Sequence, residues 1–385
     1  MSNRIRIEAV ATEDLPQFAR SYAEQAHSQV ISPITSARAE AQAKNPLASP
    51  GDVGLLVAYS GEKCVGHLGV IPGVLRTGQE QIPMIWTYGL FVQPEYRTST
   101  AVLQLMKRLI LMKKDTVITG FNEPSRRLCT AFGFRDFGRL EFLKLDLRNL
   151  DLVSALTRKF GRLTAKITGR KPRSEFSQSL LYVPIRRTVL GRLSCRASSQ
   201  LSTVTSQEVE RVRPPVYVEL PSPTAVCRDV ETVNWMLDNP WIPEAKAPTH
   251  PPYAFSDVRN LSRFIAVELE NERGECTGYV TLLVTEKRGR RTLKMLDVRV
   301  LDPSQYEAVL WLAILHAKRF DVEQLVLPME MEQAVGGIRV LARTVSQGQR
   351  SYQWLSNSED SRMSRAIDAS GPPSFSYVDG DCAYG

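Results

Sequence analysis

The stretch WTYGLFVQPEYRTSTAVLQLMKRL, residues 86–109, determines the expected fold. Its first seven residues are rich in aromatic and β-branched side chains, which favours a strand, and Pro94 forbids that strand from continuing in a central position. After Arg97, apolar residues recur every three or four positions, which predicts an amphipathic helix of about four turns. Residues 98–100 are hydroxyl residues that can cap this helix. A strand leading into an arginine and a helix N-terminus is suited to hold a phosphate or pyrophosphate.

The flanking sequence supplies further strands and a second helix. A Ser60-Gly61-Glu62 turn separates two apolar runs that read as antiparallel strands, and a short helix ends at Gly133. The expected elements, in order, are strands at 53–59 and 63–72, a turn at 77–79 into the long strand, a strand at 117–121, a helix within 122–134 and a strand near 141–147.

This order resembles the GNAT acyltransferase superfamily over roughly residues 5–147. The resemblance implies an acyl-CoA slot between the strand near Val92 and the strand near Phe121, with backbone amides after Arg97 around the pyrophosphate. The family loop usually contains several glycines, whereas residues 97–102 contain none, which reshapes the loop unless the hydroxyl groups substitute. The implied cofactor-binding residues are Leu90, Phe91, Val92, Arg97, Thr98, Ser99, Thr100, Ala101, Val102, Asn122 and Ser125.

Acylation of an amine requires a group or a water chain that accepts the amine proton. The catalytic candidates near the slot are His67, Tyr88, Asn122 and Glu123. His67 has a suitable ordinary pKa, although a structural role for a strand histidine is the simpler interpretation. Many family members carry a tyrosine that protonates the leaving thiolate, and the matching residue here is Cys129, which is better interpreted as a buried filler.

The composition is that of an ordinary globular protein, with 385 residues, 43% hydrophobic and 23% charged. The length suggests two domains, or three if the middle folds alone. We expect a cytoplasmic protein, because there is no run of 18 apolar residues and no signal-peptide core at the start. The six cysteines form no C-x-x-C pair and the chain has four histidines, so we expect neither a metal site nor a disulfide framework.

Positive charge is concentrated in one segment. Residues 158–196 contain eleven Lys or Arg and one acid, Glu175, whereas the whole chain has a net charge of +8. Residues 151–168 read as a basic amphipathic helix. It packs at the domain junction with a solvated face, touches an anionic membrane surface through residues 151–196, or attracts an anionic substrate. Nucleic-acid binding is disfavoured because aromatic residues are not interleaved with the charges.

The second half repeats the order of the first. Strands are expected at 264–269, 277–285 and 292–300, then a helix at 305–320, a strand at 324–327 and a helix at 333–344, with strands at 352–355 and 375–378 closing that sheet. Its loop at 301–305 lacks arginine and glycine, and Asp302 would repel a pyrophosphate. We interpret this half as a degenerate copy.

The predicted fold class is therefore α/β (α+β), two tandem GNAT-like domains, each a mixed, mostly antiparallel sheet flanked by helices. The predicted divisions are residues 1–150, which bind acyl-CoA, residues 151–215, which form the basic helix and linker, and residues 216–385. The candidates for acceptor binding in the last of these are Trp354, Tyr377, Asp379 and Asp381. Tandem arrangements with one degenerate copy resemble bacterial sugar N-acyltransferases.

The predicted function is transfer of an acyl group from acetyl-CoA or another acyl-CoA to a primary amine by direct attack in a ternary complex. The resemblance to sugar N-acyltransferases implies that this amine belongs to a nucleotide-linked amino sugar. Two alternatives remain open. One is an acceptor amine on a membrane- or lipid-linked molecule, and the other is a catalytically silent GNAT-fold binding or scaffold protein. The sequence leaves the acyl chain and the oligomeric state undetermined.

Overall fold

The computed structural model describes most of the chain. The described residues are 4–25, 31–77, 80–149, 182–201, 205–213, 224–226, 228–245, 251–255, 258–358, 361–371, 373–377 and 379–380. The predicted basic helix at 151–168 and the acceptor candidate Asp381 lie outside these residues.

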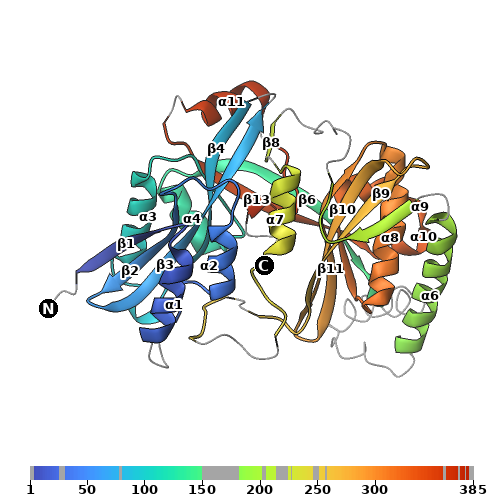
Figure 1. The fold of residues 1–385 in the computed structure, drawn as a ribbon, viewed down its shortest axis with the longest axis horizontal. Helices are drawn as coiled ribbons and strands as arrows, with labels where there is room; N and C mark the ends of the chain where they lie inside the picture. Colours follow the sequence, from blue (N-terminus) through green and yellow to red (C-terminus); the bar gives the residue numbers. More distant parts are fainter. Residues whose placement is uncertain are drawn as a thin grey trace, which may run out of the picture.

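The described strands form one continuous 13-stranded sheet that runs through both halves of the molecule (Figure 1). The order across the sheet is β1-β2-β3-β4-β5-β13-β6-β12-β11-β10-β9-β7, and β8 pairs with β3 beside this path. Most neighbouring strands are antiparallel, but β4 with β5 and β11 with β12 are parallel. The expectation of a mixed, mostly antiparallel sheet flanked by helices is thus confirmed.

The first half follows the predicted order of elements. The long strand β4 ends before Pro94, as the sequence indicated, and a short 3₁₀ turn η1 leads into helix α3. The elements are β1 Ile5–Ala11, α1 Leu15–Gln25, α2 Ser36–Ala43, β2 Val53–Ser60, β3 Lys63–Thr77, β4 Glu80–Val92, η1 Pro94–Tyr96, α3 Ala101–Leu111, β5 Thr116–Thr119, α4 Glu123–Ala131 and β6 Arg135–Asp146.

Two apolar clusters attach helices to opposite faces of this half of the sheet. One cluster joins Leu105 and Leu109 of α3 to Leu56 of β2. The other joins Leu15 of α1 and Ala39 of α2 to β2 on its other face. Because side chains alternate between the faces of a strand, β1, β2 and β3 each contribute to both clusters, and this half has three layers.

The second half repeats the element order of the first. A hairpin leads into a strand, a 3₁₀ turn, a long helix and a parallel strand. The elements are α6 Tyr182–Gln200, β7 Thr205–Val209, β8 Thr224–Val226, α7 Val230–Asp238, β9 Ser262–Glu270, β10 Cys276–Lys287, β11 Arg290–Val300, η5 Pro303–Gln305, α8 Tyr306–Arg319, β12 Gln324–Pro328, α9 Glu332–Gly337, α10 Arg339–Ala342, β13 Val345–Leu355 and α11 Arg362–Ser370.

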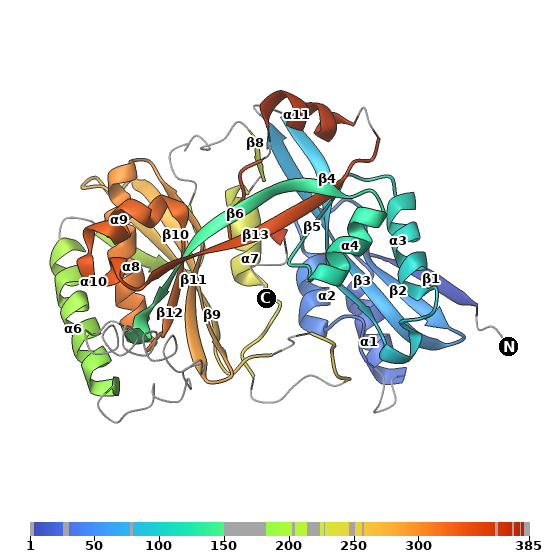
Figure 2. The same cartoon turned by 180° about the vertical axis from the view of Figure 1, so that it is seen from behind.

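The last long strand of each half pairs with a strand of the other half. Strand β6 follows α4 in the first half, yet it pairs with β12 of the second. Strand β13 follows α10 in the second half, yet its end pairs with β5 of the first (Figure 2). The sequence-based expectation that residues 352–355 close the second sheet is therefore wrong, because the end of β13 lies between β5 and β6. Residues 375–377 form no strand either.

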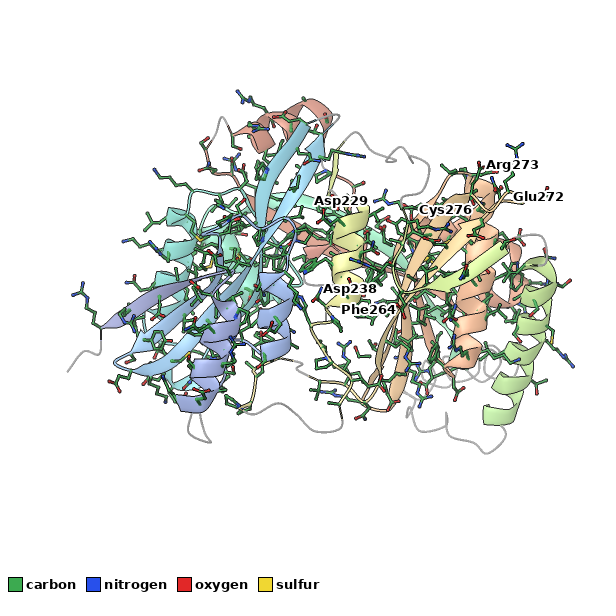
Figure 3. The ribbon with its side chains drawn as sticks, in the orientation of Figure 1. Asp229, Asp238, Phe264, Glu272, Arg273 and Cys276 are labelled. Atoms are coloured by element: carbon green, nitrogen blue, oxygen red, sulfur yellow. The ribbon has the colours of Figure 1, made fainter. Side chains whose placement is uncertain are left out.

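Helix α7 lies between the two halves, with Asp229 and Asp238 at its two ends (Figure 3). The Asp229 carboxylate caps it by accepting a hydrogen bond of 2.8 Å from the Thr232 amide. The indole of Trp235 on this helix donates a hydrogen bond of 2.7 Å to the Ala41 carbonyl of α2. None of the helices in the described part of the chain combines the length and the apolar character needed to cross a bilayer.

Candidate active site

A cavity opens where the parallel strands β4 and β5 separate. Their pairing covers only residues 85–87 of β4 and 116–118 of β5, after which β4 continues to Val92 while β5 stops at Thr119. Beyond Thr87, β4 is paired with no strand on that side in the described part of the chain. The cavity has a volume of about 790 Å³ and is lined by β4, the loop after β5, α4 and two segments of the second half.

A β-bulge at Gly89 shapes this opening. Gly69 of β3 pairs with Tyr88 and His67 pairs with Phe91, so that β4 places both Gly89 and Leu90 opposite a single residue of β3. Gly89 has φ +60°, the left-handed region in which a side chain is strained. A Cβ atom there would lie 3.4 Å from the Tyr253 hydroxyl and 3.4 Å from the Phe255 ring. Glycine is thus favoured by the bend, whereas a Cβ atom would make only ordinary van der Waals contacts.

Tyr88 is fixed in the wall of the cavity. A Cβ atom on Gly69 would lie 2.1 Å from Cζ of Tyr88, so the ring lies directly across this glycine. Nε2 of Gln42 in α2 donates a hydrogen bond to the Tyr88 hydroxyl, and the Trp241 ring packs at 5.3 Å between centroids. Tyr88 is therefore placed where it can contact a bound substrate.

Three of the predicted cofactor-binding residues, Leu90, Asn122 and Ser125, line the cavity. Asn122 is the N-cap of α4 and accepts a hydrogen bond of 3.0 Å from the Ser125 amide. Val92 is buried in the core beneath α3. Phe91 is not among the lining residues, and its ring packs against His67 at 5.6 Å and against Phe255 at 6.4 Å.

The loop that opens α3 does not line this cavity among the described residues. Arg97, Thr98 and Thr100 are exposed. The Ser99 hydroxyl donates to the Tyr96 carbonyl at 2.6 Å and accepts from the Ala101 amide at 3.2 Å, so it caps one amide that the resemblance assigns to a pyrophosphate. The following N–H groups, including that of Val102, lack intrahelical acceptors by the geometry of a helix start.

The opposite end of the cavity is built largely by residues far from β4 in sequence. Arg38 of α2, Phe255 and Lys287 line it, and the last two belong to the second half. The segment that carries Phe255 is held to the first half, since the Ser32 amide donates to the Pro252 carbonyl at 2.8 Å. Arg38 lies over the ring of Tyr253 at 5.1 Å.

His67 is buried beside this end of the cavity. Its ring packs on Tyr253 at 5.8 Å and on Phe255 at 6.2 Å. Burial, together with the positive charge of Arg38, lowers the pKa of His67 to about 3, so the ring is neutral at physiological pH. Its Nε2 atom has no hydrogen-bond partner among the described residues.

Two ionisable side chains of α4, those of Glu123 and Cys129, have shifted pKa values. Hydrogen bonds from Arg126 and Arg127 lower the pKa of the exposed Glu123 carboxyl to about 2, and both Nε atoms lie 2.9 Å from its oxygens. Burial raises the pKa of the Cys129 thiol to about 11. Each group therefore stays in one protonation state near neutral pH.

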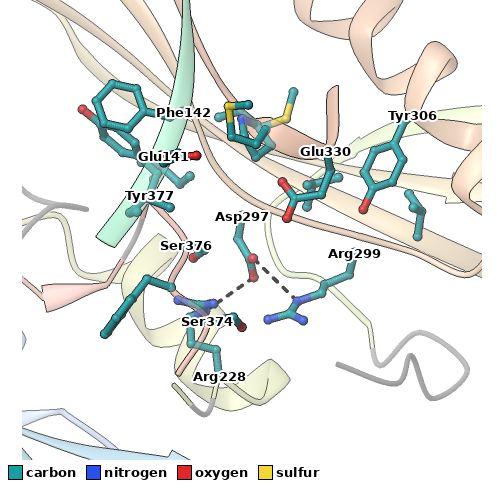
Figure 4. Close-up of a pocket in the computed structure, with 18 of the residues that line it drawn as sticks. Glu141, Phe142, Arg228, Asp297, Arg299, Tyr306, Glu330, Ser374, Ser376 and Tyr377 are labelled. Carbon is teal, nitrogen blue, oxygen red and sulfur yellow. Dashed lines mark ion pairs between the residues drawn. The ribbon is translucent and has the colours of Figure 1, made fainter. Parts of the chain in front are cut away.

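The structure places the acceptor candidates of the second half away from the β4–β5 cavity. The Trp354 ring is buried against Phe137 at 5.5 Å. Tyr377 lines a second cavity of about 730 Å³, which opens beside β11 and β12 at the place that corresponds to the first cavity (Figure 4). Strand β11 also carries a register shift there, next to Thr281 of β10.

Asp379 belongs to a buried charge cluster beside this second cavity. It pairs with the Arg228 guanidinium, whose Nε lies 3.7 Å from Asp297, and Asp297 lies 3.6 Å from Nε of Arg299 (Figure 4). Burial raises the pKa of Asp379 to about 6, despite the opposing effect of Arg228. The Asp297 carboxyl keeps a pKa below its ordinary value because both arginines outweigh its burial.

Sequence reasoning missed Arg38, Tyr253, Phe255 and Lys287. The run 287–291 contains four cations around a glycine turn and was readable as a charged hairpin tip. No local pattern connects the other three with residues near position 88, because their proximity depends on how the two halves are joined.

The chain is similar to known acyltransferases in sequence and in fold. Residues 6–134 match the family model described as an acetyltransferase (GNAT) domain. No curated protein matches the chain in sequence.

Among solved structures, a GCN5-related N-acetyltransferase from Anabaena variabilis is 12% identical with a TM-score of 0.47, covering 92% of this chain and 73% of that one. A conserved protein of unknown function from Enterococcus faecalis is 12% identical with a TM-score of 0.46, covering 91% and 72%. The Saccharomyces cerevisiae N-myristoyltransferase with bound myristoyl-CoA is 10% identical with a TM-score of 0.47, covering 92% and 83%.

The match of residues 6–134 coincides with the half that contains the β4–β5 cavity. Over these residues the chain matches a GNAT acetyltransferase domain, and this match supports an acyl-CoA-dependent N-acyltransferase.

Proposed function

We propose that the β4–β5 cavity is the catalytic site, and that it transfers an acyl group from acyl-CoA to the primary amine of an amino sugar, in nucleotide-linked form. The observation that carries the proposal is the early end of the β4–β5 pairing, after which the last part of β4 borders a cavity in place of a neighbouring strand. In this arrangement the pantetheine chain pairs with β4 near Leu90 in place of a neighbouring strand.

The donor enters on the side of α4 and α3. Asn122 and Ser125 lie along its path, and the helix opening after Arg97 takes the pyrophosphate through unpaired N–H groups and the positive end of the helix dipole. An N–H group of β4 at the bulge polarises the thioester carbonyl and stabilises the negative charge that develops on its oxygen.

The acceptor enters from the side of Arg38 and Phe255. Its amine attacks the thioester carbon directly; the C–N bond forms, the C–S bond breaks, and the sulfur leaves as CoA thiolate. The aromatic ring of Phe255 offers a surface for a sugar ring, and Arg38 with Lys287 favours an acceptor with negative charge.

A water chain is the better proton acceptor of the two options that the sequence left open. His67 is neutral, but a pKa of about 3 makes its imidazole a weak base. With a water chain, His67→Gln leaves the pH dependence of kcat unchanged, whereas with His67 as the base the variant removes most of the activity.

Calorimetric titration with acetyl-CoA and with free CoA tests the donor site. Replacing Arg97 by Ala removes a charge-assisted contact with the pyrophosphate, and we expect affinity to fall about tenfold. Arg108→Ala is the matched control, because it removes an exposed cation from the last turn of the same helix, away from the opening.

Two results would contradict the proposal. Equal weakening by the two substitutions would mean that only overall charge attracts CoA. No heat with either ligand would favour a catalytically silent GNAT-fold protein. If CoA binds, a screen of amines that compares nucleotide-linked amino sugars with lipid-linked amines identifies the acceptor class.

A further inference from the structure

The charged groups that line the β4–β5 cavity are all of one sign. Arg38 and Lys287 are the charged side chains among its lining residues, and no carboxylate lines it in the described part of the chain. Arg38 comes from α2, and Lys287 comes from the hairpin between β10 and β11 of the second half. The charged lining of the cavity is therefore positive, and part of it belongs to the second half.

The effect of Arg38 on its neighbours supports this positive potential. Arg38 is buried, with 5% of its surface exposed, and its guanidinium lies 5.3 Å from the Trp241 ring and 5.1 Å from the Tyr253 ring. Its charge adds to burial in lowering the pKa of two neighbours, His67 and Arg259. A buried field that disfavours other cations is favourable for a bound anion.

Lys287 also connects the cavity to a basic cup on the surface of the second half. This cup has a volume of about 540 Å³ and is lined by Lys287, Arg288, Arg290 and Arg148, with Glu323 as the one acidic residue among its described lining. Nε of Arg290 is buried and has no hydrogen-bond partner among the described residues. The Arg148 guanidinium pairs with Asp146 at 3.1 Å, so Lys287, Arg288 and Arg290 remain for a ligand.

We propose that the basic cup binds a diphosphate group of the acceptor, so that the β10–β11 hairpin of the second half selects the substrate of the first. This inference rests on the proposed function and names the group that the acceptor must carry. A diphosphate in the cup contacts Lys287 and Arg290, while the rest of the acceptor extends past Phe255 so that its amine reaches Tyr88. Arg38 stabilises the polar group nearest the amine.

Calorimetric titration of uridine diphosphate into the full chain tests the proposal. The titration is done on the free protein and on protein saturated with CoA, because bound CoA occupies the phosphate-binding positions of the donor. We expect uridine diphosphate to bind in both states. We expect the double variant Lys287→Gln/Arg290→Gln to weaken it at least tenfold while CoA affinity stays unchanged.

Arg273→Gln is the matched control. Arg273 lies in the β9–β10 turn, the other hairpin turn of this half (Figure 3), and it is exposed. The substitution therefore removes one cation from a comparable turn outside the cup. We expect wild-type affinity for uridine diphosphate in this variant, and equal weakening by Arg273→Gln and Arg290→Gln would overturn the proposal.

The source of the diphosphate is distinguished by a second arm. Phosphatidylcholine vesicles that contain a polyprenyl diphosphate are sedimented with the wild type and with the double variant. Capture of the wild type alone, together with weak binding of uridine diphosphate, assigns the cup to a lipid-linked acceptor. Absence of both interactions overturns the inference, and because CoA binding is measured separately, that result leaves the donor site standing.

Discussion

At the scale of single residues, Gly89 makes the clearest connection between backbone geometry and ligand binding. We expect Gly89→Ala to lower the free energy of unfolding by about 1 kcal/mol, through strain at positive φ. We also expect it to reduce affinity for acetyl-CoA at least tenfold, because relief of the strain at positive φ displaces the bulge. Urea denaturation and calorimetry measure the two effects.

Gly274→Ala is the control that separates backbone strain at positive φ from the shape of the donor site. Gly274 has φ +75° and no atom within 4 Å of its Cβ position, in a turn far in sequence from the cavity. It should lose similar stability and keep full affinity for acetyl-CoA. If both variants bind equally well, the bulge does not shape the donor site.

A site residue can be predicted from the sequence when its position depends on residues near it in the chain, and not when it depends on residues far away. Leu90, Asn122 and Ser125 were predictable because strand, turn and helix N-cap are local patterns. The bulge was not, since it depends on which residue of β3 faces Tyr88. Phe255 and Lys287 were not predictable either, because only the assembled sheet brings the second half to the first.

At the scale of elements, the exchange of β6 and β13 is the feature that pattern reasoning could not supply. The strand periodicity of residues 135–146 and 345–355 is local, and the order of elements repeats as expected. The partner of a strand is the strand edge that fits it best. The edges of β5 and β12 are of the same kind, so β6 and β13 could each pair with either. The sequence therefore predicted the strands but not their neighbours.

Gln353→Pro tests whether β13 supports both halves. Gln353 pairs with Ile118 of β5 and with Asp136 of β6, so proline breaks a ladder inside the sheet and should destabilise the fold by about 3 kcal/mol or more. Hydrogen exchange followed by mass spectrometry should show faster exchange in β5 and also in β6 and β12.

Ser206→Pro is the control for position in the sheet. Ser206 lies in β7, the strand at the sheet edge, and pairs with Leu269 of β9. Faster exchange should then be confined to β7 and β9. Faster exchange in β5 alone after Gln353→Pro would mean that the two halves fold independently.

At the scale of the whole molecule, the buried charge cluster of Arg228, Asp297 and Asp379 holds the segment near residue 379 between the two halves. Arg228 precedes α7, Asp297 lies in β11 of the second half, and Asp379 pairs with Arg228. The next residue, Gly380, reaches the first half, where a Cβ atom would lie 2.8 Å from Thr119. Thr119 lines the β4–β5 cavity. The backbone at residues 379–380 therefore runs from the charge cluster beside the second cavity to the wall of the first.

Ionisation of Asp379 should make stability depend on pH. Its pKa is raised to about 6 in the folded protein, above the ordinary value of 3.8, so between these values the folded state binds more protons than the unfolded state. Stability contributed by this group is therefore present at low pH and is lost as pH rises towards 6. Asp379→Asn resembles the protonated side chain at every pH and lacks this loss.

Urea denaturation of the wild type and of Asp379→Asn at pH 5 and at pH 7 measures the effect. We expect the stability of the variant relative to the wild type to increase by about 1 kcal/mol from pH 5 to pH 7, the sign that the raised pKa requires. All other titrating groups are common to both proteins and cancel. A relative stability that stays constant over this range would mean that Asp379 is already ionised at pH 5 and that its pair with Arg228 outweighs the burial of the carboxylate.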